Sequence, residues 1–392
     1  MARIVVVYFD AGGGHRASAR ALLDAIRLRD REWSVELVNL DDVLEPVDPC
    51  HMFTGRRASE WYNWWLRSGW TVGSSLLIPV MHAGIRLLSP VHMRLLRRYW
   101  RQMRADLVVS VIPHFNRPLY ESLRAEAPGV PFVTLLTDLA DYPPHFWIEG
   151  QDQHFICGTQ RAVQQASIQG GPNASVWRVS GMVLHPRFYE TRSQDQPAGR
   201  RRLGLDPDRL TGIALFGGHA SRNMLNVARH AMSGRAQMIF LCGHNRRLAD
   251  RLRALQFPFP TYVESFTENI ADFMHLGDFF VGKAGPGSIS EALLMGLPVI
   301  VESSPRTLAN ERYNIEWIRE HQLGVVIRDF KELPAAMEHL ADPEVRRLIR
   351  RRAAALINRA VFEVVDIVDR ILQGRKPDPG LATDVFELES AR

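Results

Sequence analysis

Residues 281–301 read Val281-Gly-Lys-Ala-Gly-Pro-Gly-Ser-Ile-Ser-Glu-Ala-Leu-Leu-Met-Gly-Leu-Pro-Val-Ile-Val301. The order is a buried strand, a glycine-rich turn, a helix and a second strand, which is typical of a parallel α/β sheet. An ordinary strand-to-helix turn needs only one glycine. The small residues here let the backbone approach a diphosphate at the helix N-terminus without a metal. Glu291, one turn into the helix, can accept two hydrogen bonds from a ribose diol.

A second glycine loop lies near the N-terminus. Residues 10–19, Asp-Ala-Gly-Gly-Gly-His-Arg-Ala-Ser-Ala, follow an apolar run over 4–9 and precede helical spacing over 16–29. The loop meets a loose dinucleotide fingerprint, but the side chain of His15 would crowd the pyrophosphate that this fingerprint admits. A histidine at the mouth of a parallel sheet is well placed for proton transfer, because its ordinary pKa is about 6.5. The alternative role for His15 is a cap of the loop.

The strand-and-helix pattern occurs twice along the chain. Strands are expected at 34–40, 106–112 and 131–136, and then, after a turn-prone stretch over 191–202, at 211–216, 236–242, 261–263, 279–281 and 298–301. Helices are expected over 222–232, 343–360 and 361–372. The sequence therefore predicts an α/β fold with a first domain of 1–186, a second domain of 187–355, and a C-terminal helix and loose tail over 356–392.

The segment from about 50 to 104 departs from this alternation and is expected to be a helical insertion in the first domain. It holds five of the nine tryptophans and a cluster of arginines. One interpretation is that the aromatic side chains pack into the domain. The other is an amphipathic helix pair that docks on an anionic membrane; the sequence does not separate the two. The residues concerned are Trp61, Trp64, Trp65, Trp70, Trp100, Arg94, Arg97, Arg98 and Arg101.

The composition excludes several classes of protein. The 392 residues carry a formal charge of +5, with 46% hydrophobic and 23% charged residues, which is ordinary globular usage and not that of a disordered or collagenous chain. Three widely spaced cysteines exclude a disulfide scaffold, and the scattered histidines suggest no metal site. No apolar run approaches the roughly 20 residues that span a bilayer. We expect a cytoplasmic protein with no cofactor, no metal and no nucleic-acid partner.

The two glycine motifs together carry a resemblance. Residues 10–19 and 283–292 resemble the signatures of the monogalactosyldiacylglycerol synthase and processive diacylglycerol glucosyltransferase family, and more distantly the lipid-linked GlcNAc transferase of peptidoglycan synthesis. The resemblance covers about 3–372, with support from Thr137-Asp138, from 181–186 and from 310–314. It implies the GT-B arrangement, in which two Rossmann-like domains face each other across a cleft. The chain departs from the galactosyl branch in its short glycine run at 216–221 and in Asn310, where a glutamine is usual, so the donor sugar stays open.

The resemblance implies inverting transfer of a hexose from a UDP-sugar to a lipid hydroxyl, most simply that of diacylglycerol, at the inner face of the cell membrane. His15 would take the acceptor proton, and Asp138 is the other possible base or the group that orients His15. Backbone amides and Lys283 would meet the diphosphate, Glu291 the ribose, 310–314 the sugar and 266–267 the base. The implied donor residues are Gly217, Gly218, Phe266, Thr267, Lys283, Gly285, Pro286, Gly287, Ser288, Glu291, Asn310, Glu311 and Asn314. The implied acceptor and membrane residues are Gly13, Gly14, Trp61, Trp64, Trp65, Trp70, Arg94, Arg97, Arg98 and Arg101.

Other functions remain open from the sequence. The nearest are a UDP-HexNAc 2-epimerase of the same two-domain fold and a transferase that uses a different lipid. A nicotinamide-dependent oxidoreductase would use the first glycine loop and leave the second without a role. A non-catalytic membrane-binding protein would use only the tryptophan and arginine segment.

Overall fold

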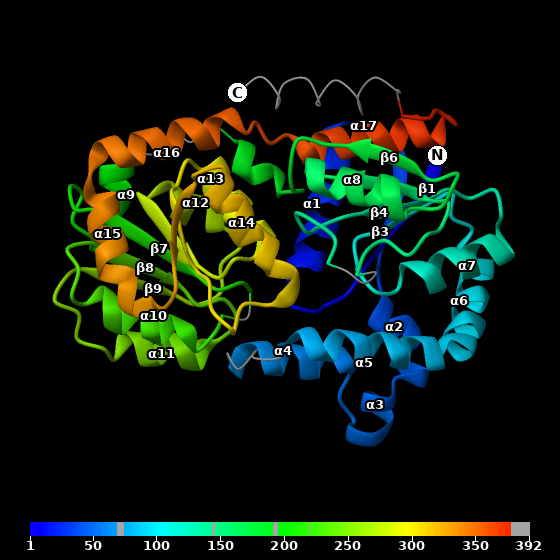
Figure 1. Ribbon diagram of the computed structural model, residues 1–392, viewed down its shortest axis with the longest axis horizontal. Helices are drawn as coiled ribbons and strands as arrows, with labels where there is room; N and C mark the ends of the chain where they lie inside the picture. The colour runs from blue at the N-terminus through cyan, green and yellow to red at the C-terminus, as the bar shows by residue number, and fades with distance from the viewer. Residues whose placement is uncertain (69–73, 143–145, 191–194, 219, 378–392) are drawn as a thin grey trace.

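The computed structural model describes residues 1–68, 74–142, 146–190, 195–218 and 220–377, which form two α/β domains side by side (Figure 1). The sheet of the first domain has the order β2-β1-β3-β4-β5-β6, with every neighbouring pair parallel. Its strands are β1 (Ala2–Tyr8), β2 (Trp33–Asn39), β3 (Leu107–Ser110), β4 (Phe132–Leu135), β5 (His154–Cys157) and β6 (Ser175–Arg178).

The sheet of the second domain is also parallel throughout and has the order β12-β11-β10-β7-β8-β9. Its strands are β7 (Thr211–Leu215), β8 (Gln237–Leu241), β9 (Thr261–Glu264), β10 (Phe279–Gly282), β11 (Val299–Glu302) and β12 (Gly324–Ile327). The predicted fold class is confirmed, and each expected strand lies within two residues of its predicted bounds. Strands β5, β6 and β12 were not predicted from the sequence.

Helices cover the faces of both sheets. Those of the first domain are α1 (Gly14–Leu28), α2 (Leu40–Leu44), α3 (Pro49–Thr54), α4 (Ala58–Ser68), α5 (Ser74–Leu87), α6 (Ser89–Met103), α7 (Asn116–Glu126) and α8 (Gln160–Gln169). Those that follow are α9 (Gln196–Arg202), α10 (Asn223–Ala231), α11 (Arg246–Arg253), α12 (Ile270–His275), α13 (Pro286–Leu294), α14 (Arg312–Glu320), α15 (Leu333–Ala341), α16 (Pro343–Ala355) and α17 (Ala360–Leu372). Short 3₁₀ helices are η1 (Glu45–Val47), η2 (Pro186–Tyr189), η3 (Ala309–Glu311) and η4 (Phe330–Glu332).

The C-terminal helix α17 returns to the first domain. Val361 and Val364 of α17 lie in one core with Leu22 of α1 and Ile4 of β1 (Figure 1). The chain crosses between the domains after α16, where Asn358 donates a hydrogen bond to the Met182 carbonyl at 3.0 Å. The predicted helix over 343–360 therefore ends early, at Ala355.

Each sheet reverses its strand order at one point, and ligands of parallel α/β sheets bind outside the carboxyl ends of the strands at such points. In the first sheet the point is between β1 and β3; the loop after β1 is the first glycine loop. In the second sheet it is between β7 and β10; the loop after β10 is the second glycine loop. The sheet topology therefore indicates ligand sites at the same two glycine loops that the sequence does.

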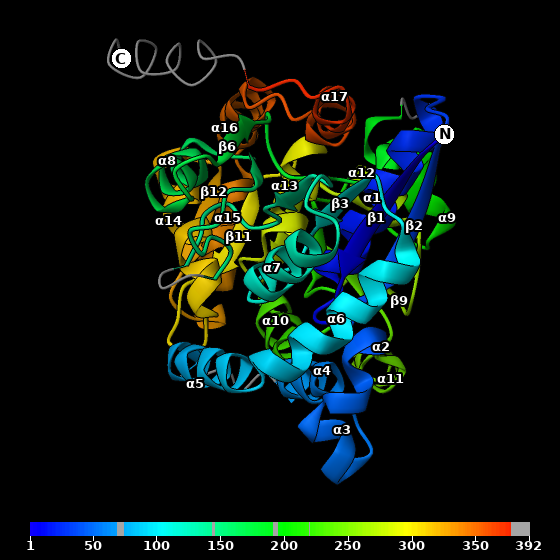
Figure 2. The same ribbon diagram turned by 90° about the vertical axis from the view of Figure 1, so that its right-hand side faces the viewer.

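The insertion divides into a packed part and an exposed part. Trp100 of α6 is buried in the core of the first domain and donates a hydrogen bond to Ser122 Oγ at 2.8 Å. Helices α3, α4 and α5 lie at the end of the molecule opposite α16 and α17 (Figure 1, Figure 2). They carry what we call the apolar patch, the exposed side chains Met52, Phe53, Trp61, Trp64, Val80, Met81 and Leu87. Trp65 is half-buried, and Trp70 lies outside the described residues. None of the described helices is long and apolar enough to cross a bilayer.

Candidate active site at the domain interface

His15 is held at the start of α1 in a defined orientation. Its Nδ1 lies 2.8 Å from the Val111 carbonyl oxygen and 3.3 Å from Thr137 Oγ1. Because a carbonyl can only accept, Nδ1 carries the proton and the lone pair is on Nε2. Burial, with a smaller contribution from the positive charge of Lys283, lowers the pKa of His15 to about 4. The imidazole is therefore neutral at neutral pH, with Nε2 able to accept a proton.

Asp138 is buried beside the interface and bonded to both domains. Its Oδ2 accepts from Trp147 Nε1 at 2.9 Å, and its Oδ1 accepts from Asn310 Nδ2 of the second domain at 3.4 Å. Burial, with the nearby Glu311 carboxylate, raises the pKa of Asp138 to about 7. The hydrogen bonds that fix the His15 imidazole come from Val111 and Thr137, whereas Asp138 holds Trp147, whose ring lies 6.1 Å from that of His15. The role of Asp138 as a base or as an orienting group stays a prediction.

Lys283 points into the interface. Its Nζ lies 2.5 Å from Oε1 of the buried Glu311. A Cβ built on Gly285 would come within 3.3 Å of Lys283 Cε, and one on Gly217 within 3.7 Å. The glycines thus let the lysine lie between the loops that follow β7 and β10, where a diphosphate would meet its charge.

The glycine loops of the two domains face each other. Gly13 and Gly217 both have positive φ, +86° and +75°. A Cβ built on Gly13 would lie 3.9 Å from Gly218 Cα, and one on Gly217 would lie 3.9 Å from the Gly12 carbonyl oxygen. The loop that carries His15 therefore abuts the loop expected to hold the leaving diphosphate.

Helix α13 presents a free N-terminus to this interface. Gly285 is its N-cap without a side-chain cap, Pro286 follows, and a Cβ on Gly287 would meet no atom within 4 Å. The first-turn amides, including that of Ser288, have no partner within the helix and can donate to an anion.

Glu291 lies one turn further along α13 and is half-buried. Burial alone raises the pKa of its carboxyl to about 7. Among the described residues, this carboxyl has no hydrogen-bond or ion-pair partner. A half-buried carboxyl without a partner can accept hydrogen bonds from a bound diol.

The residues expected near the base, Phe266 and Thr267, lie in the loop that follows β9. Phe266 is 49% exposed and its ring stacks on His244 at 4.0 Å between centroids. Thr267 Oγ1 accepts from the Asn269 amide at the start of α12. His244 was not predicted as a site residue. It lies in the loop after β8, and such a position after a strand is the signal that could have identified it.

Asn314 differs from its prediction. Its side chain is fully buried and donates to the Ala284 carbonyl at 2.7 Å. It therefore fixes the loop between Lys283 and Gly285 and does not face a sugar. Asn310 and Glu311 do lie at the interface, beside Asp138 and Lys283.

A pocket beside these residues joins the two domains. Gly12 and Leu66 of the first domain meet residues of the second domain around Lys283 and Glu311. The remaining lining residues are Phe216, Ala220, Ser221, Asn223, Ala284, Glu302, Arg306, Thr307, Leu308 and Phe330.

The arginines of α6 are not equivalent. Arg97 and Arg101 both bind Glu126 of α7, at 2.5 and 2.6 Å. Arg94 and Arg98 are exposed on the same helix and have no hydrogen-bond or ion-pair partner among the described residues. Only these two are free to meet an anionic surface.

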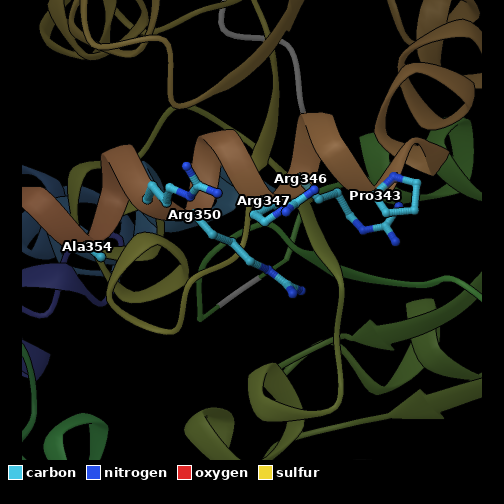
Figure 3. A pocket seen from close by; sticks show the side chains of 6 residues that line it. Pro343, Arg346, Arg347, Arg350 and Ala354 are labelled. Carbon is cyan, nitrogen blue, oxygen red and sulfur yellow. The ribbon is translucent and has the colours of Figure 1, made fainter.

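A separate arginine-lined hollow lies on α16, far from the glycine loops (Figure 1, Figure 3). Its arginines are Arg346, Arg347, Arg350 and Arg351. Arg350 donates to the Gly296 carbonyl at 3.1 Å, and Arg347 pairs with Glu344 of its own helix. Over the described residues, no group of three or more His, Cys, Asp or Glu is placed to hold a metal ion.

Comparisons with known proteins agree with this geometry. Residues 216–370 match the model of the glycosyltransferase family 28 C-terminal domain. The two parallel domains and this match define a glycosyltransferase of the GT-B class.

Within that class the chain is similar to the monogalactosyldiacylglycerol synthases. The chloroplastic enzyme of Spinacia oleracea is 24% identical, over 95% of this chain and 73% of the relative. The resemblance carried by the two glycine motifs is therefore confirmed.

Solved structures agree on the fold. MurG of Acinetobacter baumannii matches with a TM-score of 0.56 at 12% identity, over 94% of this chain and 99% of that one. UGT89C1 of Arabidopsis thaliana, complexed with UDP, matches with a TM-score of 0.63 at 13% identity, over 95% of this chain and 100% of that one.

Proposed function

We propose that this protein transfers a hexose from a UDP-sugar to a lipid hydroxyl, most simply that of diacylglycerol, with inversion at the anomeric carbon. The observation that carries the proposal is the neutral imidazole of His15, which lies near enough to Lys283 of the second domain for that charge to lower its pKa. The relatives named monogalactosyldiacylglycerol synthases support a lipid acceptor. UDP bound in a solved structure of the same fold supports the donor class.

In the proposed reaction the acceptor oxygen attacks the anomeric carbon as the bond from that carbon to the diphosphate breaks. The hydroxyl proton passes to His15 Nε2, and the electron pair leaves with UDP. The positive charge of Lys283 lowers the basicity of His15. A bound diphosphate offsets that positive charge, so His15 becomes a stronger base when the donor is present.

The donor is held by the second domain. The diphosphate accepts hydrogen bonds from the first-turn amides of α13 and takes the charge of Lys283, so no divalent ion is required. Glu291 accepts from the ribose hydroxyls, and Asn310 and Glu311 lie where the sugar would be. Addition of EDTA should leave turnover unchanged.

The acceptor is reached at a membrane surface on the cytoplasmic side. The apolar patch supports this placement, because exposed tryptophan side chains favour the headgroup level of a bilayer.

The test is incubation of the protein with radiolabelled UDP-glucose, UDP-galactose or UDP-GlcNAc and total lipid. We expect label from one donor to become organic-soluble, and the His15→Ala variant to lose that transfer. Conversion of a UDP-HexNAc without any acceptor would instead identify an epimerase.

A further inference from the structure

Asn63 is a buried polar side chain on a helix that is otherwise largely exposed. It lies on α4 of the insertion with 8% of its surface accessible, between Trp61 and Trp64, which are 38% and 58% exposed. Its position therefore points it away from the apolar patch and toward the domain.

The amide of Asn63 closes the first glycine loop. Its Oδ1 accepts from the Gly12 amide at 2.7 Å, and its Nδ2 donates to the Asp10 carbonyl at 2.7 Å. One side chain thus satisfies the backbone at both ends of a three-residue turn. Two further residues of α4 contact this turn, since a Cβ on Gly12 would lie 3.7 Å from Leu66 and 4.0 Å from Tyr62.

The Asp41 carboxyl accepts a hydrogen bond from the Asp10 backbone amide at the start of the loop, but the two glycines that follow have little besides Asn63 to fix them. Gly12 and Gly13 both have positive φ, +70° and +86°, and Gly13 caps α1 without a side-chain cap. Glycines lose the most conformational freedom on ordering, so such a turn needs external contacts to hold one conformation. The ion pair between Arg16 and Asp10, at 2.9 Å, restrains a side chain and not this backbone.

We propose that Asn63 is a positioning residue for the transfer reaction: it holds the first glycine loop so that His15 Nε2 faces the second domain. The inference rests on the proposed function, in which His15 is the base. Asn63 touches neither substrate, so its effect passes through Gly12 and the start of α1. The helix that carries the exposed tryptophans is then the helix that sets the geometry of the base.

Loss of Asn63 has a consequence that a purely structural role does not. If the loop loosens, His15 leaves its contact with Val111 and gains water, so its pKa rises from about 4 toward its ordinary value of about 6.5. Two groups act on His15 itself: Lys283, and His114, whose own pKa is held low by burial and by its neighbours His82 and His15. The charged and titratable groups around the loop are Asp10 with its partner Arg16, Asp41 at the Asp10 backbone, and Tyr62 beside Gly12.

The experiment compares Asn63→Ala and Asn63→Ser with the wild type, using the full chain. Histidines are labelled with ¹⁵N, and His15 is assigned with the His15→Gln variant. The control is Asn173→Ala, which removes an amide that bonds Asp152 at 3.0 Å on the outer edge of the first domain.

We expect the His15 titration to move to higher pH in Asn63→Ala and by less in Asn63→Ser, and to stay unchanged in the control. Turnover is measured with the UDP-sugar that the radiolabel experiment identifies as the donor. It should fall by about 10- to 100-fold in Asn63→Ala, as for a misplaced catalytic group. The UDP dissociation constant should stay unchanged.

A His15 titration that coincides with the wild type in both Asn63 variants would overturn the inference. Loss of folding in both would overturn it as well, because Asn63 would then be a stability residue. If instead the titration shifts while His15→Ala retains full turnover, the positioning stands and the proposed role of His15 fails.

Discussion

At the scale of single residues, the site gathers side chains whose pKa values are displaced by burial. The pKa of His15 is lowered to about 4, while the pKa values of Asp138 and Glu291 are raised to about 7. Perturbed titratable groups of this kind, gathered at a domain interface, are typical of active sites. His15 and Glu291 could be named from the sequence because they lie in glycine motifs, and Asp138 because it follows a predicted strand, but their protonation states follow only from packing.

The role of His15 as base is tested by His15→Ala. Turnover should fall by about 10²–10⁴-fold, the usual contribution of a positioned general base. UDP affinity should stay nearly unchanged, because the donor is held by the other domain. His339→Ala, which removes an exposed histidine of α15, is the matched control. Near-normal turnover in His15→Ala would move the base role to Asp138.

The role of Glu291 in donor binding is tested by Glu291→Ala. Each charge-assisted hydrogen bond to the ribose is worth about 1.5–3 kcal/mol, so the UDP dissociation constant should rise tenfold or more. Calorimetric titration measures it, with Glu316→Ala, an exposed carboxylate of α14, as control. Unchanged affinity in the folded variant would place the nucleotide elsewhere.

The raised pKa of Glu291 also predicts how stability depends on pH. In the folded chain the carboxyl keeps its proton up to about pH 7, but in the unfolded chain it loses it near pH 4.3. The folded state binds more protons in that window, so stability falls as pH rises through it. Glu291→Gln should lose less stability than the wild type between about pH 5 and pH 8 in denaturant titrations. The pH dependence that comes from Asp138 is the same in both proteins and cancels in the comparison. Equal losses of stability in the wild type and in Glu291→Gln would show that burial does not raise the pKa of Glu291.

At the scale of elements, the insertion shows where sequence analysis stops. Its amphipathic pattern is the same for a packed helix and for a docking helix, so the two interpretations could not be separated. In the structure, each interpretation fits a different helix. Trp100 of α6 is packed in the core, whereas Trp61 and Trp64 of α4 are exposed. The contact of Asn63 with the first glycine loop carried no sequence signal, because it joins positions about 50 residues apart.

The membrane contact is tested on the two free arginines of α6. Arg94→Gln with Arg98→Gln should weaken sedimentation with phosphatidylglycerol vesicles, since each basic residue near an anionic surface is worth about 1 kcal/mol. Arg347→Gln with Arg351→Gln makes the same charge change on α16, at the opposite end of the molecule, and should have no effect (Figure 1). If both pairs weaken binding equally, the attraction depends on net charge and not on this face.

At the scale of the whole molecule, the site exists only where the two domains meet. The two sheets, their parallel topology and both glycine motifs could be predicted from the sequence, because each motif follows a strand and opens a helix. The pairings across the interface could not. The bond between Asp138 and Asn310 spans 172 positions, and no local pattern reports it. Nor could the return of α17 to the first domain be predicted, since its apolar face would fit either domain.

The central claim is inverting transfer to a lipid hydroxyl, and the anomeric configuration of the product tests it most directly. The protein is incubated with diacylglycerol vesicles and the α-linked UDP-hexose it accepts, and the glycolipid is purified and examined by proton NMR. A β-glycoside of diacylglycerol, formed by the wild type and lost in His15→Ala, is the predicted result. An α-glycoside, or an altered UDP-sugar with no glycolipid, would contradict the account.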